Sequence, residues 1–244
     1  MKTLFKSIVV LLVFAVAGLA RGQNTVYNGL TTPVSSGGNQ VVFPMSNGVA
    51  IGQEITMQND MLVQSNHLVS FTFAYYSTNT SWSGPVSGDI QFYYNNGPLT
   101  NGYASPGGIF YDSGFWNLAL PQSYSTNALA VTFGLSDIYS SLSLGGALTP
   151  MGANLGLPSD FTVVFTVTGL ASGDSLALPI YTPPTVGTNY SDYWVQNGSA
   201  WSVVTNNASP VSFGMTFETT PEPSVLGLGA LGMVLMAHLI RRRK

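Results

Sequence analysis

The chain contains no cysteine, and only 7% of its 244 residues are charged, against about 25% in typical soluble domains. The lack of cysteine excludes a disulfide framework, a thiol nucleophile and a cysteine-based zinc site. Lysine and arginine are absent from Gly22 through Ile240, so all seven basic residues lie near the two ends. A body without basic side chains cannot neutralise phosphates, and it offers no lysine for a phosphate-binding loop or a Schiff base. Nucleic acid is therefore excluded as a partner.

The N-terminal residues have the organisation of a secretory signal peptide. Lys2 and Lys6 form a positively charged region, and the apolar run 8–16 that follows is too short for a permanent membrane span. A small-x-small sequence predicts cleavage between residues 22 and 23, and its defining positions are Ala20, Gly22 and Gln23. Cleavage after Ala20 and an uncleaved anchor remain as alternatives. Residues 1–22 are therefore predicted to export the body from the cytoplasm.

The C-terminal residues 219–244 contain a second membrane-directed segment. The uncharged run 225–240 would be about 24 Å long as a helix, slightly shorter than a hydrocarbon core of about 30 Å. Four consecutive basic residues follow it, which predicts a transmembrane helix with a cytoplasmic tail; they are Arg241, Arg242, Arg243 and Lys244.

This tail resembles the PEP-CTERM sorting signal of Gram-negative bacteria that produce exopolysaccharide. The resemblance rests on Pro221, Glu222 and Pro223 followed by Ser224, then a short span rich in glycine and leucine, then the terminal basic cluster. It implies that an exosortase, a membrane protease or transpeptidase, cleaves near the motif after signal peptidase has acted at the other end. The inner membrane would then hold the protein only transiently, and the body would reach the cell surface or be secreted. A plain single-pass anchor is the alternative.

The body, residues 23–218, has the pattern of half-buried β-strands. Apolar and aromatic residues alternate with polar ones in segments separated by clusters of glycine, proline, asparagine and serine. The segments are 69–75, 89–94, 129–135, 161–167 and 211–217. One short helix is expected near 135–142. The prediction is an all-β domain, a single antiparallel β-sandwich of jelly-roll-like type, flanked by the signal helix and the transmembrane helix.

One hairpin can be predicted in register. Asn197-Gly198 is a strong two-residue turn signal, and as the turn it would place Trp194 directly opposite Trp201. Opposed residues of an antiparallel pair share a face, so the two indole rings are expected side by side as a platform for stacking on sugar rings. Burial in the core is the alternative for both tryptophans.

The body also looks similar to a recurring type of PEP-CTERM ectodomain, which mostly has no assigned activity. The stretches that carry this resemblance are 52–56, 68–76, 91–97, 106–108 and 111–114. Asn96 stands where the similar pattern often has an acidic residue, which speaks against a metal-binding loop.

Catalytic and metal-binding patterns are weak. The body has one histidine, His67, and no Gly-x-Ser-x-Gly motif accompanies it. Its acidic residues stand singly beside glycine, serine or asparagine, as in turns and caps. We therefore predict no enzymatic activity, no metal site and no cofactor. Calcium binding is kept as an alternative, because loops offer the side-chain oxygens of Asp89, Asp112, Asn95 and Asn96, but no ligand set can be assigned.

The expected function is that of an exported structural or adhesive protein of the cell surface or extracellular matrix. The first alternative is a carbohydrate-binding module for exopolysaccharide, and the second is a divergent glycoside hydrolase. With signal peptide and tail removed, every acidic residue except Glu222 remains and no basic one does, so the body carries a formal charge of -9.

Overall fold

Strands are the only regular secondary structure among the described residues, which confirms the all-β prediction. The computed structural model describes residues 24–36, 39–58, 66–120, 129–134, 155–205 and 211–221. No helix in these ranges is long and apolar enough to cross a membrane. The signal peptide, the expected helix near 135–142 and residues 222–244 lie outside the described residues.

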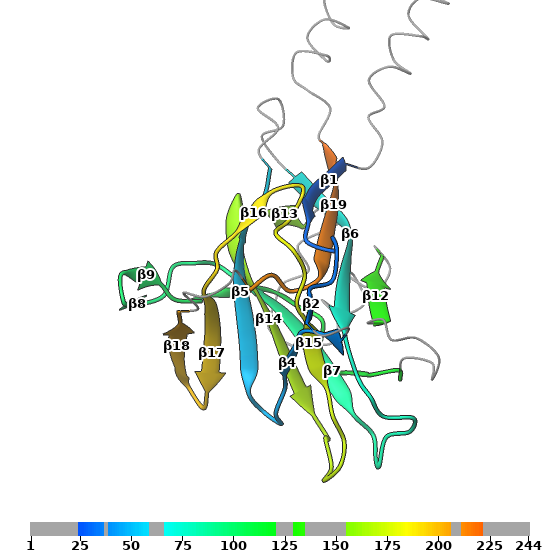
Figure 1. The fold of residues 1–244 in the computed structure, drawn as a ribbon. Helices are drawn as coiled ribbons and strands as arrows, with labels where there is room; N and C mark the ends of the chain where they lie inside the picture. The colour runs from blue at the N-terminus through cyan, green and yellow to red at the C-terminus, as the bar shows by residue number, and fades with distance from the viewer. Residues whose placement is uncertain are drawn as a thin grey trace, which may run out of the picture.

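The smaller of the two main sheets has five antiparallel strands and contains both ends of the described chain (Figure 1). Its central path is β1, β19, β6 and β12, and β13 also pairs with β6. The strands are β1 (Asn24–Asn28), β6 (Asn66–Tyr75), β12 (Leu129–Phe133), β13 (Gly156–Leu157) and β19 (Met215–Pro221).

The larger main sheet has eight strands along the path β10, β7, β14, β5, β17 and β18, with β11 on β7 and β16 on β5. The strands are β5 (Ala50–Thr56), β7 (Ser87–Tyr93), β10 (Ile109–Asp112), β11 (Trp116–Asn117), β14 (Asp160–Thr168), β16 (Thr188–Asn189), β17 (Tyr193–Asn197) and β18 (Ala200–Val204). Three two-stranded ladders complete the fold: β2 (Ser35–Ser36) with β3 (Asn39–Gln40), β4 (Val42–Pro44) with β15 (Ala177–Pro179), and β8 (Leu99–Thr100) with β9 (Tyr103–Ala104).

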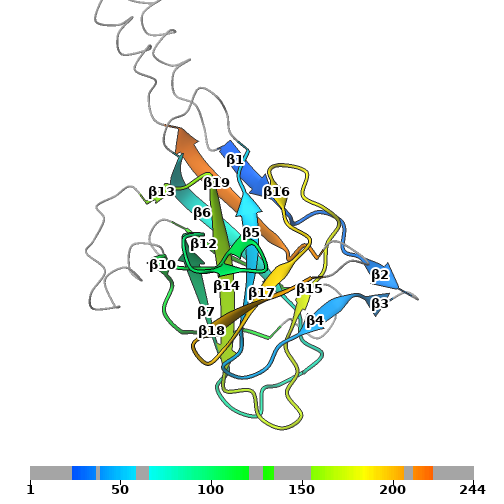
Figure 2. The same ribbon diagram turned by 90° about the vertical axis from the view of Figure 1, so that its left-hand side faces the viewer.

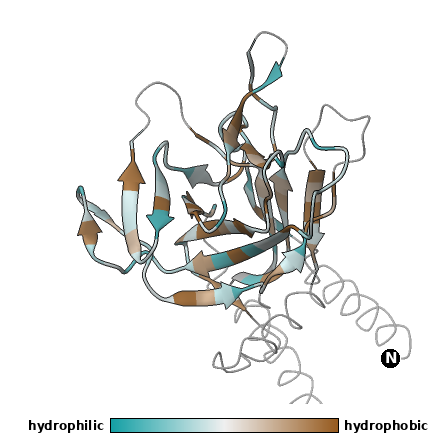
Figure 3. Ribbon diagram, turned by 90° about the horizontal axis from the view of Figure 1, so that it is seen from below, coloured by the Kyte–Doolittle hydropathy of each residue, from teal (hydrophilic) through white to brown (hydrophobic). Residues whose placement is uncertain are grey.

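The two main sheets face each other across an aromatic core. Phe71 of β6 lies with its ring centroid 5.1 Å from that of Phe92 in β7, and Phe73 lies 4.9 Å from Phe165 in β14. Successive side chains of a strand point to opposite faces, so the two faces of each sheet carry different sets of residues. Figure 3 shows hydrophobic and hydrophilic residues following one another along the strands. The predicted inward face of 161–167 is confirmed, because its four apolar residues belong to the main core cluster, whereas the buried Val164 between them belongs to a separate cluster on the opposite face.

The last strand differs from the prediction for 211–217. It begins at Met215 and continues to Pro221, beyond the expected end of the body at residue 218. The preceding backbone is held instead by the side chain of the buried Gln53, which donates to the Val211 carbonyl and accepts a 2.8 Å hydrogen bond from the Phe213 amide. An amide side chain can satisfy one donor and one acceptor at once, so this segment remains buried without being paired as a regular strand.

The first and last strands lie side by side, and the described chain therefore starts and ends at one pole. In the β1–β19 ladder Asn24 pairs with Thr219, and on the other edge of β19 Pro221 pairs with Asn66. Figures 1 and 2 show β1 and β19 together at the top of the molecule in two perpendicular views. Any segment attached at either end leaves from that pole.

Candidate functional site

The face of the eight-stranded sheet that points away from the aromatic core carries a set of polar and aromatic side chains, several of them buried. We call it the outer face. Its members alternate in sequence with core residues and share the sheet through strand pairing: Ala50, Gly52, Glu54, Asp89, Gln91, Tyr93, Thr162, Val164, Thr166, Trp194, Gln196 and Trp201.

The outer face is concave. Tyr93 of β7 and Trp201 of β18 have ring centroids 5.6 Å apart, although three strands separate β7 from β18 in the sheet. Four strand spacings in a flat sheet would put the two strands about 19 Å apart. Side chains stand roughly perpendicular to a sheet, so the contact requires the sheet to curl toward its outer face. Figure 2 shows β18 running obliquely to β14, as a strongly twisted sheet requires.

The tryptophan hairpin forms, but its predicted register is wrong. Trp194 pairs with Val203 and Trp201 pairs with Gln196, so the two rings share a face without standing opposite each other. The turn residues are Gly198 and Ser199, and Gly198 has a φ of 70°. A turn centred on Asn197-Gly198 would need a positive φ at both residues, whereas a turn with glycine first needs it at Gly198 alone.

The two tryptophans also differ in exposure, which changes the predicted sugar platform. Trp194 is only 2% exposed, although it lies on the outer face, and Trp201 is half-buried. Gly52 stands directly across from Trp194, and a Cβ added there would lie 3.3 Å from the Trp194 Cβ. Trp194 is therefore part of the packed sheet, and only Trp201 keeps an accessible ring surface.

A pair of carboxyl groups lies at the β7–β10 edge of the outer face. Asp89 is 6% exposed, accepts a 3.0 Å hydrogen bond from the Ser113 hydroxyl and is hydrogen bonded to Asp112. Burial, with a further contribution from the charge of Asp112, raises the pKa of Asp89 to about 7. Two carboxyl groups in direct contact share a proton, since both cannot be ionised cheaply at this distance.

Asp112 is in turn held by groups from its own loop and from β7. One oxygen accepts a 2.8 Å hydrogen bond from the Gln91 amide, and the other accepts a 2.7 Å bond from the Gly114 backbone N–H. Gln91 accepts a 2.8 Å bond from the Tyr93 hydroxyl. These bonds form a continuous polar chain from Tyr93 to Asp89, and they occupy donors and acceptors that a ligand would otherwise use.

A second cluster of polar side chains lies on the outer face where β14 begins, and it consists of Glu54, Asn95, Asp160 and Thr162. Burial, with a smaller contribution from Asp160, raises the pKa of Glu54 to about 7. Thr162 donates a 2.7 Å hydrogen bond to the Asn95 side chain, whose amide nitrogen lies 3.4 Å from Asp160. Asn95 thus ties the chain that leaves β7 to the sheet.

Of the residues considered for metal binding or catalysis, Asp89 and Asp112 meet as a pair, whereas Asn95 and Asn96 bind other partners. Among the described residues no three histidine or acidic side chains gather into a metal-binding group. The Asn96 side chain accepts from the Gly108 N–H at 3.1 Å, and His67 lies in β6 opposite Gly156. Glycoside hydrolases hold their carboxyl pair about 5 to 9.5 Å apart, whereas Asp89 and Asp112 are in hydrogen-bond contact.

An extended connection between β7 and β10 carries exposed apolar side chains, of which Leu99 and Tyr103 were not candidates from the sequence. We call residues 94–108 the arm; β8 and β9 form its tip (Figure 1). Tyr94 and Tyr103 are each 39% exposed and Leu99 is 75% exposed. Asn101 and Gly102 both have positive φ, as a tight two-residue hairpin requires. The Asn101-Gly102 pair is the sequence signal from which this hairpin could have been predicted.

No protein-family model, no curated protein sequence and no solved structure matches this chain. The functional interpretation therefore rests on the residues themselves.

Proposed function

We propose that the protein is exported and displayed at the cell surface or in the extracellular matrix, where it acts as a structural or adhesive module without catalytic activity. The observation that carries this proposal is the adjacency of Asn24 and Thr219 in the β1–β19 ladder. Both terminal segments leave from one pole, so a precursor held in the membrane by either end keeps the rest of the body directed outward.

The proposal includes the two processing steps that the sequence predicts. Signal peptidase cleaves before Gln23, and an exosortase recognises the PEP-CTERM-type tail and cleaves near Pro221 to Pro223. The jelly-roll-like classification and the two flanking helices belong to the same proposal. Because β19 includes Pro221 in its pairing, the folded body reaches the first residue of the sorting motif.

A non-catalytic role is supported by the arrangement of the carboxyl groups. Asp89 and Asp112 contact each other and bind Ser113, Gln91 and Gly114, which is the arrangement of a structural pair. Glu54 lies near Asp160, away from the Asp89–Asp112 pair, and there Asn95 of the arm is hydrogen bonded to Thr162 and Asp160 of β14.

Localisation of two chains in the producing cells tests the proposal. Full-length protein should be accessible to protease added outside the cells, and mass spectrometry should find Gln23 as its first residue and a C-terminus close to Pro221. A chain ending at Pro221 keeps all of β19 but is no substrate for exosortase transpeptidation, so it should not be attached at the surface and should appear in a soluble fraction. Identical location of both chains would overturn the proposal.

A matched variant separates exosortase processing from a plain anchor. Glu222→Ala combined with Pro223→Ala leaves the apolar run 225–240 and the basic cluster intact. If an exosortase acts, this variant stays in the membrane with Lys244 as its last residue, whereas the wild type is cleaved. Uncleaved wild type would show that the tail is a permanent anchor.

A further inference from the structure

Exposed apolar side chains are concentrated on and beside the arm. Among the described residues, six large apolar side chains are exposed, and five of them are in the arm, at its end or in contact with it: Tyr94, Leu99, Tyr103, Ile109 and Tyr190. Tyr190, 46% exposed, joins this set from the β16–β17 connection because its ring centroid lies 6.5 Å from that of Tyr103. The sixth, Phe115, lies just after the C-terminal end of β10, whereas the arm leads into the N-terminal end of that strand.

The arm holds these rings in a defined arrangement. Its two halves are joined by backbone hydrogen bonds, of 2.9 Å from Gly97 N–H to the Ser105 carbonyl and of 2.9 Å from Gly107 N–H to the Tyr94 carbonyl. A Cβ at Gly97 would lie 2.5 Å from the Ser105 hydroxyl oxygen, so the halves approach as closely as glycine permits. Tyrosine loses little conformational entropy on binding, so rings held this way favour recognition.

The chemistry of the arm selects an uncharged ligand. Residues 94–109 contain no charged side chain; between the exposed rings they present asparagine amides, a threonine and backbone groups. Aromatic rings stack on the apolar faces of sugar rings while amides and hydroxyls bind the sugar hydroxyls. The body around the arm has no basic residue and a formal charge of -9, which repels nucleic acids, acidic polysaccharides and anionic membranes.

We propose that the arm, together with Tyr190, binds a neutral polysaccharide chain. This inference rests on the proposed adhesive function and names its partner. The binding surface extends from Tyr190 and Tyr103 toward the half-buried Trp201, since β8 lies beside β18. The sugar-stacking surface therefore consists of Tyr103 and Tyr190 instead of the predicted Trp194–Trp201 pair, and Trp201 lies at its edge.

Affinity electrophoresis of the purified full-length chain tests this inference, in a detergent without a sugar headgroup so that the detergent does not compete. The probes are amylose, cellulose fragments, β-1,3-glucan and galactomannan, with alginate as the acidic comparison. Wild-type protein should be retarded by at least one neutral polymer and not by alginate. The double variant Tyr103→Ala, Tyr190→Ala should bind about tenfold more weakly, and Tyr103→Phe should bind nearly as well as wild type, because stacking uses the ring.

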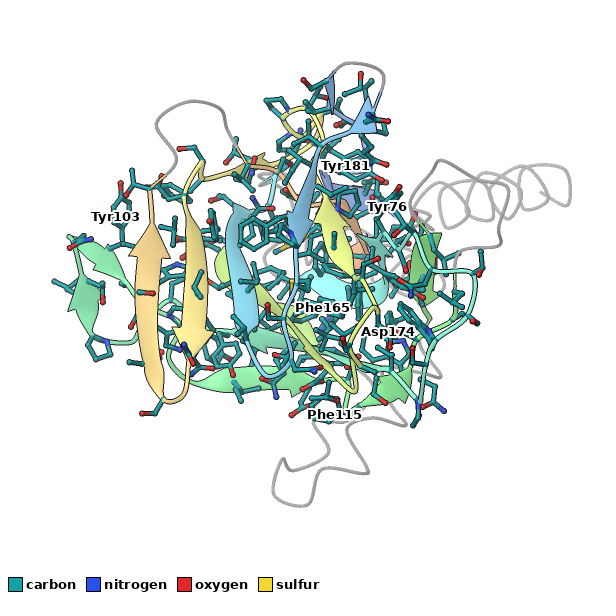
Figure 4. All side chains as sticks on the ribbon, turned by 60° about the horizontal axis from the view of Figure 1, so that its bottom comes forward. Tyr76, Tyr103, Phe115, Phe165, Asp174 and Tyr181 are labelled. Atoms are coloured by element: carbon teal, nitrogen blue, oxygen red, sulfur yellow. The ribbon has the colours of Figure 1, made fainter. Side chains whose placement is uncertain are left out.

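Phe115→Ala is the matched control, since it removes an aromatic ring of 59% exposure away from the arm. Tyr103 and Phe115 occupy well-separated parts of the molecule in Figure 4. This variant should bind as the wild type does. The inference is overturned if none of the neutral polymers retards the wild type, if alginate alone does, or if Phe115→Ala weakens binding as much as the double variant. Since binding is measured on purified protein, its failure is independent of any failure of surface sorting.

Discussion

The Ser113 hydroxyl donates a 3.0 Å hydrogen bond to the buried carboxyl of Asp89 and so joins β7 to the connection between β10 and β11. The same serine oxygen accepts a 2.9 Å bond from the Ile90 N–H. Asp112, from the same connection, completes the carboxyl pair. The body has no lysine or arginine to place beside this pair, and burial together with the charge of Asp112 raises the pKa of Asp89.

The first prediction concerns the pH dependence of stability. The pKa of Asp89 is about 7 in the folded protein against an ordinary value of 3.8, and Glu54 changes in the same direction, from 4.5 to about 7. Between these values the folded chain binds more protons than the unfolded chain, so the free energy of unfolding falls as pH rises from about 4 to about 7 and then levels off. Thermal unfolding of the full-length protein should show a higher Tm at pH 5 than at pH 8. A Tm that rises over this interval would contradict the assignment.

The second prediction assigns part of that dependence to Asp89. Asp89→Asn keeps an oxygen that can accept the Ser113 bond but removes the titrating proton. The decline of Tm between pH 5 and pH 8 should become shallower, and the variant should be more stable than wild type at pH 8. The control is Asp192→Asn, whose carboxylate lies 3.5 Å from the neighbouring Ser191 hydroxyl, and this variant should keep the wild-type slope.

The third prediction concerns the buried amide of Gln53, which is 0% exposed and binds both Val211 and Phe213. Gln53→Ala leaves the Phe213 N–H without its partner, while the Val211 carbonyl keeps its 2.9 Å hydrogen bond from the Asn189 side chain. The substitution should lower the free energy of unfolding by about 1–3 kcal/mol. Urea unfolding followed by fluorescence measures the loss. The exposed Gln58 is the matched control. If Gln58→Ala costs as much, the Gln53 bonds do not contribute to stability.

The fourth prediction tests the packing of the outer face. A Cβ at Gly52 would lie 2.9 Å from Thr162 Cγ2 and 3.2 Å from Val164 Cγ2. Gly52→Ala should therefore destabilise the protein by about 1–3 kcal/mol through crowding. Gly84→Ala is the control, because a Cβ at Gly84 has no neighbour within 4 Å. Equal urea midpoints for Gly52→Ala and Gly84→Ala would show that the outer face has room beside Trp194.

The fifth prediction concerns where the folded body ends. Thr219 is 1% exposed and pairs with Leu68, and Pro221 pairs with Asn66. A chain that stops after Pro221 should unfold at the same temperature as the full-length protein, whereas one that stops after Glu218 should lose several degrees. Equal melting temperatures for the two truncated chains would restore the boundary at 218 that the strand pattern suggests.

Much of the fold could be predicted from local patterns, because a strand with one buried face must alternate. Phe161, Val163 and Phe165 were assigned to one face by alternation alone, and all three are buried in the core. The last strand was placed too early, since Val211 and Phe213 continue the same alternation while their backbone binds a side chain from β5. Alternation reports which residues share a face, and it does not report which group satisfies the backbone.

The candidate site was less accessible to prediction. Trp194 and Trp201 were grouped correctly on one face, but alternation cannot distinguish a ring covered by a curled sheet from an exposed one. The arm carried its own Asn-Gly turn signal at Asn101. The contact of Tyr103 with Tyr190 joins residues 87 positions apart, and no local signal predicts such a contact.

The sequence by itself determined the strand faces, the absence of basic charge from the body and the predicted export and sorting segments, because these depend on residue type and short-range spacing. The tertiary structure alone decided the hairpin register, the burial of Trp194, the contact of Asp89 with Asp112 and the position of the arm beside β18. The last three features depend on the curl of one sheet and on loop conformation, which bring together residues far apart in sequence. The hairpin register depends on which two residues adopt the turn conformation.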